Sequence, residues 1–193
     1  MFKKPAGFLG GVALWVACGS VSAAQLGGVL YANLDIGGDT LITTSKGDVD
    51  AGALVHFAGG IALHDYASGH LETQLTIGMK ADRVAISKGE ASFQRWPVEL
   101  MQFFKVGNFR IGAGASYHLD PEAECDIDDV CDTITEFDDA LGYVGQIDFV
   151  LPLTGWMREL TVGARATFID YEIRDSGLKI EGDSVGVSLG ISF

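Results

Sequence analysis

Long apolar runs and basic residues are both scarce in this sequence, and each scarcity excludes a class of protein. After Ala23, no apolar stretch approaches the roughly 20 residues that a membrane-spanning helix needs, so a helical membrane domain is excluded. The 193 residues contain 13 Lys and Arg against 26 Asp and Glu, a formal net charge of −13. A strongly negative chain repels a phosphate backbone, so nucleic acid is excluded as a partner.

The first 23 residues have the pattern of a secretory signal peptide. Two lysines precede an apolar stretch over residues 8–17, and small residues up to Ala23 offer a cleavage site. Cys18 suggests an alternative, lipoprotein processing, but Trp15 stands where a lipobox usually has leucine. Cleavage would leave residues 24–193 as a single domain with 11 basic and 26 acidic residues, a net charge near −15.

Apolar and polar residues alternate along eight segments of the remaining chain. Alternation at period two is typical of a strand whose two faces meet different environments. The last segment is strict, because Val185, Val187, Leu189, Ile191 and Phe193 alternate with glycine and serine. The eight segments lie near residues 30–36, 49–57, 71–80, 95–104, 109–118, 141–149, 160–168 and 185–193.

The connections between these segments alternate in length. Short ones lie near residues 64–69, 107–108 and 152–157, and long polar ones near 37–48, 81–90, 120–139 and 174–182. In outer-membrane barrels the short turns face the periplasm and the long loops face outward. The sequence therefore predicts an all-β fold, an eight-stranded antiparallel up-and-down transmembrane β-barrel with both termini in the periplasm.

Aromatic residues on the apolar faces gather at the two ends of the strands. Amphipathic rings favour the two membrane interfaces, so we expect two aromatic girdles. Pro97 interrupts one strand, and a closed barrel has no free edge for its missing N–H, so we expect a bulge or a late strand start there. The girdle residues are Trp96, Tyr117, Tyr143 and Phe168 near the long loops, and Phe104, Phe109, Phe149 and Phe193 near the short turns.

The architecture of residues 24–193 resembles the small eight-stranded outer-membrane β-barrel family, which includes the OmpA transmembrane domain, OmpX and the opacity proteins. Segments 95–100 and 110–121 also resemble a hairpin of uncharacterised proteobacterial barrel proteins. The last residue, Phe193, resembles the C-terminal signature that the barrel assembly machinery recognises. The resemblance implies an integral outer-membrane protein surrounded by lipid and lipopolysaccharide, but a fold does not determine a function.

Charged residues point into the predicted lumen, and pairing the strands places Glu99 roughly opposite Glu72 and Arg110 close to Asp148. Charges inside a narrow barrel must pair or be hydrated, because an unpaired buried ion costs several kcal/mol. We interpret them as a salt-bridged plug. The alternative is a gate, in which carboxylates exchange partners and open a narrow path for small solutes or small apolar molecules. The lumen set comprises Glu72, Glu99, Arg110, Asp148 and Arg165.

The segment 120–139 holds ten acidic residues and no basic one. Cys125 and Cys131 are the only cysteines of residues 24–193, and an exported protein meets an oxidising environment, so we predict a disulfide between them. Five acids suggest calcium, Glu124, Asp126, Asp128, Asp129 and Asp132, but the spacing and turn glycine of an EF-hand are absent. We therefore expect a solvated acidic loop. Divalent cations shared with lipopolysaccharide phosphates are the alternative.

No group of residues predicts catalysis. Ser116 and His118 share an inward face, but serine and histidine at this spacing more often simply line a lumen. We predict a monomeric, non-enzymatic barrel without cofactor or metal, which acts as a structural or surface-interaction protein. Its loop 120–139 would contact host or envelope proteins. The alternatives are a narrow gated channel and, with less support, a lipid-modifying enzyme.

Overall fold

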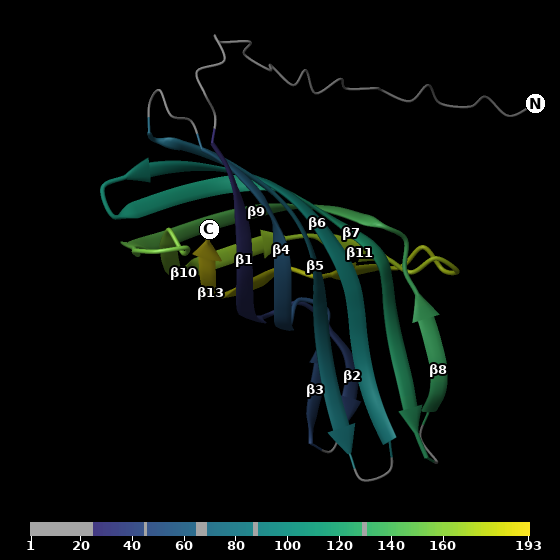
Figure 1. Ribbon diagram of the computed structural model, residues 1–193. Helices are drawn as coiled ribbons and strands as arrows, with labels where there is room; N and C mark the ends of the chain where they lie inside the picture. Colours follow the sequence, from purple (N-terminus) through teal and green to yellow (C-terminus); the bar gives the residue numbers. More distant parts are fainter. Residues whose placement is uncertain (1–24, 45, 65–68, 87–88, 129–130) are drawn as a thin grey trace, which may run out of the picture.

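The computed structural model describes residues 25–44, 46–64, 69–86, 89–128 and 131–193 (Figure 1). The predicted signal peptide, residues 1–23, lies outside the described residues. Every element that the structure describes is a β-strand. No helix in these residues is long and apolar enough to span a membrane.

Eight long strands form a closed antiparallel barrel, which confirms the predicted fold class. Around the barrel the order is β1, β4, β5, β6, β7, β9, β10 and β13, and β13 pairs with β1 to close the ring. Each strand is therefore paired on both sides, which satisfies backbone groups that lipid could not. The bounds are β1 Gln25–Ile36, β4 Leu54–His64, β5 Leu71–Ile86, β6 Gly89–Val106, β7 Phe109–Ile127, β9 Ala140–Pro152, β10 Glu159–Phe168 and β13 Ser184–Ser192.

Successive side chains of the barrel strands point alternately outward and inward. On β1, Leu30 and Leu34 are exposed on the outer wall, whereas Asn33 and Asp35 are buried inside. The same alternation continues around the ring, so the outer wall is apolar and the interior polar. A surface of this kind matches lipid outside the barrel and polar contacts within it.

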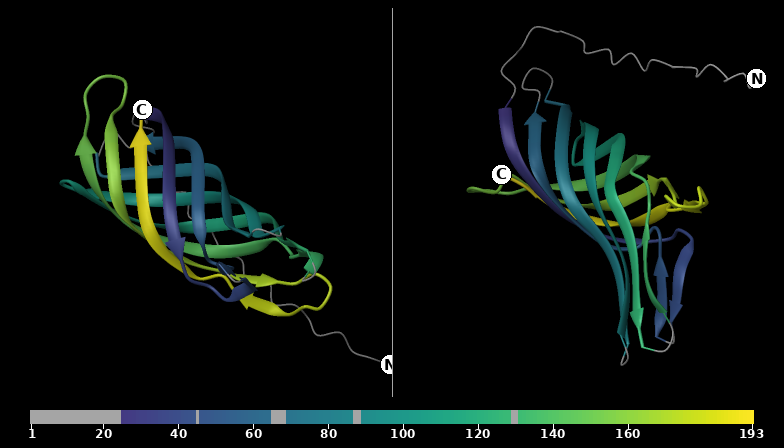
Figure 2. Two further views of the ribbon diagram at one scale, coloured as in Figure 1. Left: turned by 90° about the horizontal axis from the view of Figure 1, so that it is seen from below. Right: turned by 90° about the vertical axis from the view of Figure 1, so that its right-hand side faces the viewer.

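One end of the barrel carries four β-hairpins, which we call the crown; it comprises the described parts of residues 37–53, 81–94, 119–140 and 169–183. Figures 1 and 2 show the crown at the end of the barrel away from the C-terminus. Its strands are β2 (Thr40–Thr44) with β3 (Gly47–Asp50), the ends of β5 and β6, the end of β7 with β8 (Cys131–Glu136), and β11 (Asp170–Glu172) with β12 (Lys179–Glu181).

Residues 81–90 and 120–139, interpreted from the sequence as polar loops, are largely strands instead. β5, β6 and β7 continue far beyond the barrel wall, and β8 returns along the end of β7. Alternate residues of these extensions, such as Phe93, Ala123 and Cys125, are apolar and buried. Burial of the apolar face stabilises each hairpin. The acidic residues on the other face make these strands look like polar loops in the sequence.

The second predicted strand, residues 49–57, is divided between two elements. Val49 lies in β3 and Ala51 follows it, and both are fully buried in the crown, whereas the barrel strand β4 begins at Leu54. Gly52 lies between them, where a Cβ atom would come within 2.4 Å of the Asp183 carbonyl oxygen. The residues before Leu54 therefore face the crown rather than lipid.

The bulge predicted near Pro97 is present. Gln94 pairs with Glu122 and Trp96 with Leu119, so β7 carries one residue more than β6 across this step. Asp120, inside the step, has a positive φ of 44°. The bulge bends β7 at the boundary between the barrel wall and the crown.

Candidate functional site

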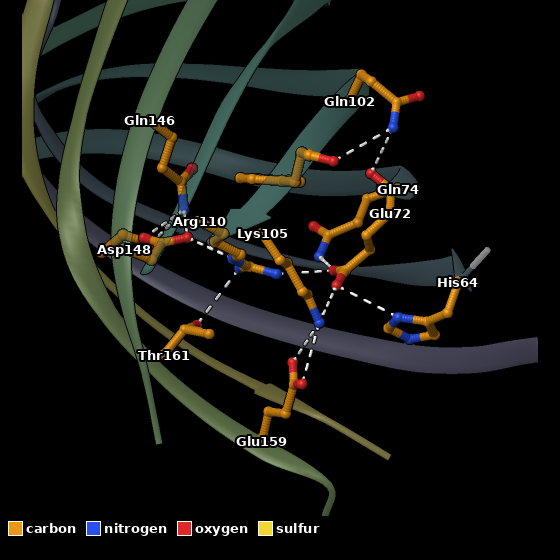
Figure 3. A network of polar contacts seen from close by, with 12 residues as sticks. His64, Glu72, Gln74, Gln102, Lys105, Arg110, Gln146, Asp148, Glu159 and Thr161 are labelled. Carbon is orange, nitrogen blue, oxygen red and sulfur yellow. Dashed lines mark hydrogen bonds and ion pairs between the residues drawn. The ribbon is translucent and has the colours of Figure 1, made fainter. Parts of the chain in front are cut away.

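A turn-side cluster of charged residues fills the lumen at the short-turn end, with Glu72 at its centre (Figure 3). Arg110 donates from Nη1 to Glu72 Oε1 at 2.7 Å, and Lys105 Nζ lies 2.7 Å from the other carboxylate oxygen. His64 Nδ1 lies 3.3 Å from that same oxygen. Gln74 Nε2 also donates to Glu72 Oε1. Glu72 is fully buried, so its charge must be balanced inside the lumen, and Arg110 and Lys105 are the cations that do so.

Arg110 joins Glu72 to a second carboxylate. Arg110 and Asp148 are directly opposed on β7 and β9, and Nε donates to Asp148 Oδ2 at 2.7 Å. The guanidinium also lies over the Phe103 ring, 4.2 Å from its centroid. Lys105 extends the cluster towards the exterior through Glu159, 2.8 Å away. The register therefore places Arg110 beside Asp148, where the sequence pairing put it.

A middle cluster surrounds Glu99. Its carboxylate accepts hydrogen bonds from Arg165 and Tyr31, and from Ser116 Oγ at 2.9 Å. The expectation that Glu99 lies opposite Glu72 is wrong. Glu99 pairs with Thr76, which lies four residues after Glu72 on β5. The hairpin register separates the two acids, so each has its own cationic partners and they do not share one.

A crown-side cluster lies where the barrel meets the crown. Lys80 Nζ lies 2.8 Å from Asp35 Oδ2 and donates to Ser184 Oγ at 3.0 Å. Arg95 is fully buried, donates from Nη2 to the Ala53 carbonyl at 2.9 Å, and lies 4.4 Å from the centroid of the Phe93 ring. Arg95 forms no ion pair among the described residues, and the rings of Phe93 and Tyr171 lie close to its guanidinium, where cation–π attraction stabilises it.

Ser116 and His118 are hydrogen-bonded, but their surroundings do not suit a nucleophile and base. His118 Nε2 lies 3.0 Å from Ser116 Oγ, while that hydroxyl donates its own proton to Glu99. His118 Nδ1 lies 2.7 Å from the Tyr171 hydroxyl, and burial raises the pKa of that phenol. Both Ser116 and His118 are 1% exposed or less, so a substrate has no direct approach to them.

The crown has an apolar core of its own, which was not predicted from the sequence. Phe93 lies at its centre, with ring centroids 5.3 Å from Phe137 and 5.3 Å from Tyr171. Cys125 and Cys131 form the predicted disulfide inside this region. The sequence feature that could have predicted this core is the alternation of apolar residues, which continues through the acidic segment 120–139. The core residues are Val49, Ala51, Ala91, Phe93, Ala123, Cys125, Ile127, Phe137, Ala140, Ile169 and Tyr171.

The predicted girdle residues all project from the outer wall of the barrel. Tyr143 and Phe168 are directly opposed near the crown, and Phe109 and Phe149 are opposed near the short turns, with ring centroids 5.2 Å apart. Trp96, Tyr117, Phe104 and Phe193 are exposed on the same wall. The two groups lie at opposite ends of the strands.

No cluster of three or more potential metal ligands occurs within the described residues. The acidic residues proposed for calcium, Glu124, Asp126, Asp128 and Asp132, are exposed along the hairpin of β7 and β8, and the fifth, Asp129, lies outside the described residues.

No family model matches the sequence. A search of curated proteins also finds no match. Among solved structures, the crystal structure of Neisserial surface protein A is similar, with a TM-score of 0.50 and 13% identity, over 89% of this chain and 98% of that one. A likeness at this identity concerns the fold alone. It agrees with the strand order and the apolar outer wall, so this chain has the fold of the small eight-stranded outer-membrane β-barrels.

Proposed function

We propose that this protein is a non-conducting, non-enzymatic outer-membrane barrel that presents its crown to envelope or host proteins. The barrel anchors the crown, with the crown outside the cell and the termini in the periplasm. The observation that carries the proposal is the crown's own apolar core around Phe93, Phe137 and Tyr171. A core of this kind holds the exposed hairpins in one conformation, so they lose less conformational entropy when they bind a partner.

The lumen clusters support a plug rather than a pore. Glu72, Glu99, Arg110, Asp148 and Arg165 are each 5% exposed or less, and each has a partner of opposite charge. Opening a water path would break these pairs inside a low-dielectric wall, where removal of one partner costs about 3–5 kcal/mol. A gated channel is the alternative, in which Glu72 exchanges among its three neighbours.

The remaining parts of the proposal concern the surroundings of the barrel. The outer wall would contact membrane lipid and lipopolysaccharide, Phe193 would be the signal for the assembly machinery, and the barrel would act as a monomer. Divalent cations could bridge the acidic hairpin to lipopolysaccharide phosphates.

Single-channel recording in a planar bilayer tests the proposal. We expect no conductance from the refolded wild-type protein, and leak in Glu99→Ala and Arg110→Ala variants, since each leaves a buried charge unpaired. Steady wild-type conductance that shifts with either substitution would make the channel the function instead. Heat-modifiable migration on gels controls for folding of each variant.

A further inference from the structure

We propose that the free edge of β8 binds an extended polypeptide segment in which basic and apolar residues alternate, so that the segment adds a strand to the crown. This inference rests on the proposed function and deepens it, because it names the chemistry of the partner. The inference is based on an unpaired strand edge that lies beside a cavity. The negative charge around this edge favours a basic partner.

β8 is the terminal strand of its sheet, and among the strands that the structure describes it pairs only with β7. Phe137 N donates to the Pro121 carbonyl on β7 at 3.0 Å, whereas the Glu136 carbonyl accepts from Arg174 N at 3.1 Å on the opposite side. Backbone groups of successive residues point to opposite edges of an antiparallel strand. The N–H and C=O groups of Asp132 and Ile134 therefore point away from β7, and they meet no backbone partner in the described part of the chain.

The base of this edge already accepts a strand. Asp138 N donates to the Glu172 carbonyl at 2.9 Å, and Phe137 forms an isolated bridge with Ile173. After Ile173 the chain turns back to form the hairpin of β11 and β12. In the described residues it therefore does not cover the edge at Asp132 and Ile134. An added strand would continue a pairing that the fold begins.

The solvent-facing side of the hairpin is acidic across both strands. Glu122 lies directly opposite Glu136, and Asp126 directly opposite Asp132, and all four side chains are exposed. Arg174 already pairs with Glu136 at the base of the edge. Like charges in directly opposed positions destabilise a strand pair. Ile134, 64% exposed, lies among them. A basic side chain on a neighbouring strand would relieve this repulsion, which favours a cationic partner.

The other side of the hairpin borders a cavity of about 450 Å³ that apolar side chains and threonines line together. Thr133 and Thr135 of β8 line it, together with Leu41 and Ile42 of β2 and Ile173 next to β11. Side chains of a strand alternate between its faces, so every second residue of an added strand would point towards this cavity. The partner therefore alternates apolar residues, facing the cavity, with basic residues, facing the acidic side.

The probe is a short fluorescent peptide of alternating lysine and valine, titrated onto the full-length protein in nanodiscs of zwitterionic lipid. Fluorescence anisotropy measures binding, and empty nanodiscs correct for lipid. We expect saturable binding that weakens by about tenfold or more when alternate peptide nitrogens are methylated, since methylation removes the donors of one edge. A glutamate–valine peptide should not bind.

Two variants of one residue separate backbone pairing from charge. Ile134→Pro removes an outward N–H that β7 does not use, so the hairpin persists while binding falls about tenfold, whereas Ile134→Ala keeps the donor and binds nearly as the wild type. Asp132→Asn should weaken binding and reduce its dependence on salt.

Equal binding of the methylated and parent peptides would overturn the inference, because charge or the cavity alone would then suffice. So would undiminished binding by Ile134→Pro, or equal capture of the glutamate–valine peptide. If the barrel does not conduct and also does not bind the lysine–valine peptide, this inference fails and the proposed function stands. Steady conductance would overturn the proposed function whatever the peptide does.

Discussion

The ring of Phe193, the last residue, packs directly against Gly28 at the start of the barrel's closing seam. Gly28 N donates to the Phe193 carbonyl at 2.8 Å, and Phe193 N donates to the Gly28 carbonyl at 3.0 Å. A Cβ atom on Gly28 would lie 2.4 Å from the phenylalanine ring. The first and last strands therefore meet through one residue that must be small and one that is large.

Enlarging Gly28 tests this seam. We expect Gly28→Val to displace the Phe193 ring and lower barrel stability by about 1–3 kcal/mol, the usual cost of overpacking. The measurement is the fraction of heat-modifiable folded protein across a urea series in lipid vesicles. Gly145→Ala is the matched control, because nothing lies within 4 Å of a Cβ atom there. Equal losses in both variants would contradict the packing argument.

Glu72 and Glu159 both contact Lys105, but they differ in burial. Glu72→Gln leaves Arg110 and Lys105 short of a buried partner, and we expect it to destabilise the barrel by about 3–5 kcal/mol. Glu159 is 24% exposed at its side chain, so Glu159→Gln should cost at most about 1 kcal/mol. Tryptophan fluorescence during urea unfolding compares them, and a similar cost for both would refute the role of Glu72 as the centre of the cluster.

Phe93 and Phe104 lie on the same strand, one inside the crown core and one on the outer wall. Phe93→Ala should loosen the crown at a cost of about 3–5 kcal/mol, because it leaves a cavity between Phe137 and Tyr171 and removes the ring beneath Arg95. Limited proteolysis should then cut the crown while the barrel remains protected. Phe104→Ala should leave crown cleavage unchanged; cleavage in both variants would mean that the crown has no separate core.

The disulfide between Cys125 and Cys131 closes a short loop within the crown. Reduction should increase hydrogen exchange in β8 and the end of β7, since it releases a constraint worth about 2–4 kcal/mol on the unfolded hairpin. Exchange in the barrel strands should stay the same, because the bond joins β7 and β8 within the crown core. Uniform loss of protection throughout the protein would show instead that the crown and barrel unfold together.

The barrel could be predicted from the sequence because its signal is local. Outward Leu30 and Leu34 and inward Asn33 and Asp35 follow from period-two alternation, and the lengths of the connections establish which strands are neighbours. The charge pair of Arg110 and Asp148 could be predicted for the same reason, since the two residues lie on neighbouring strands near the same end.

The crown and the exact charge pairs could not be predicted in this way. The alternation through Ala123, Cys125 and Ile127 is as regular as in the barrel, but its polar partners are acidic and give the appearance of a solvated loop. Likewise, the separation of Glu99 from Glu72 depends on a register set by the whole hairpin.

The sequence by itself determined that eight strands alternate, that they close into a barrel with an apolar wall, and that two cysteines can pair. Only the tertiary structure decided that four hairpins share a core, that Arg95 lies beneath it without an ion-pair partner in the described residues, and that β8 ends the sheet. The physical reason is that alternation reports the environment of each strand face, whereas contacts between hairpins distant in sequence depend on how the folded chain brings them together.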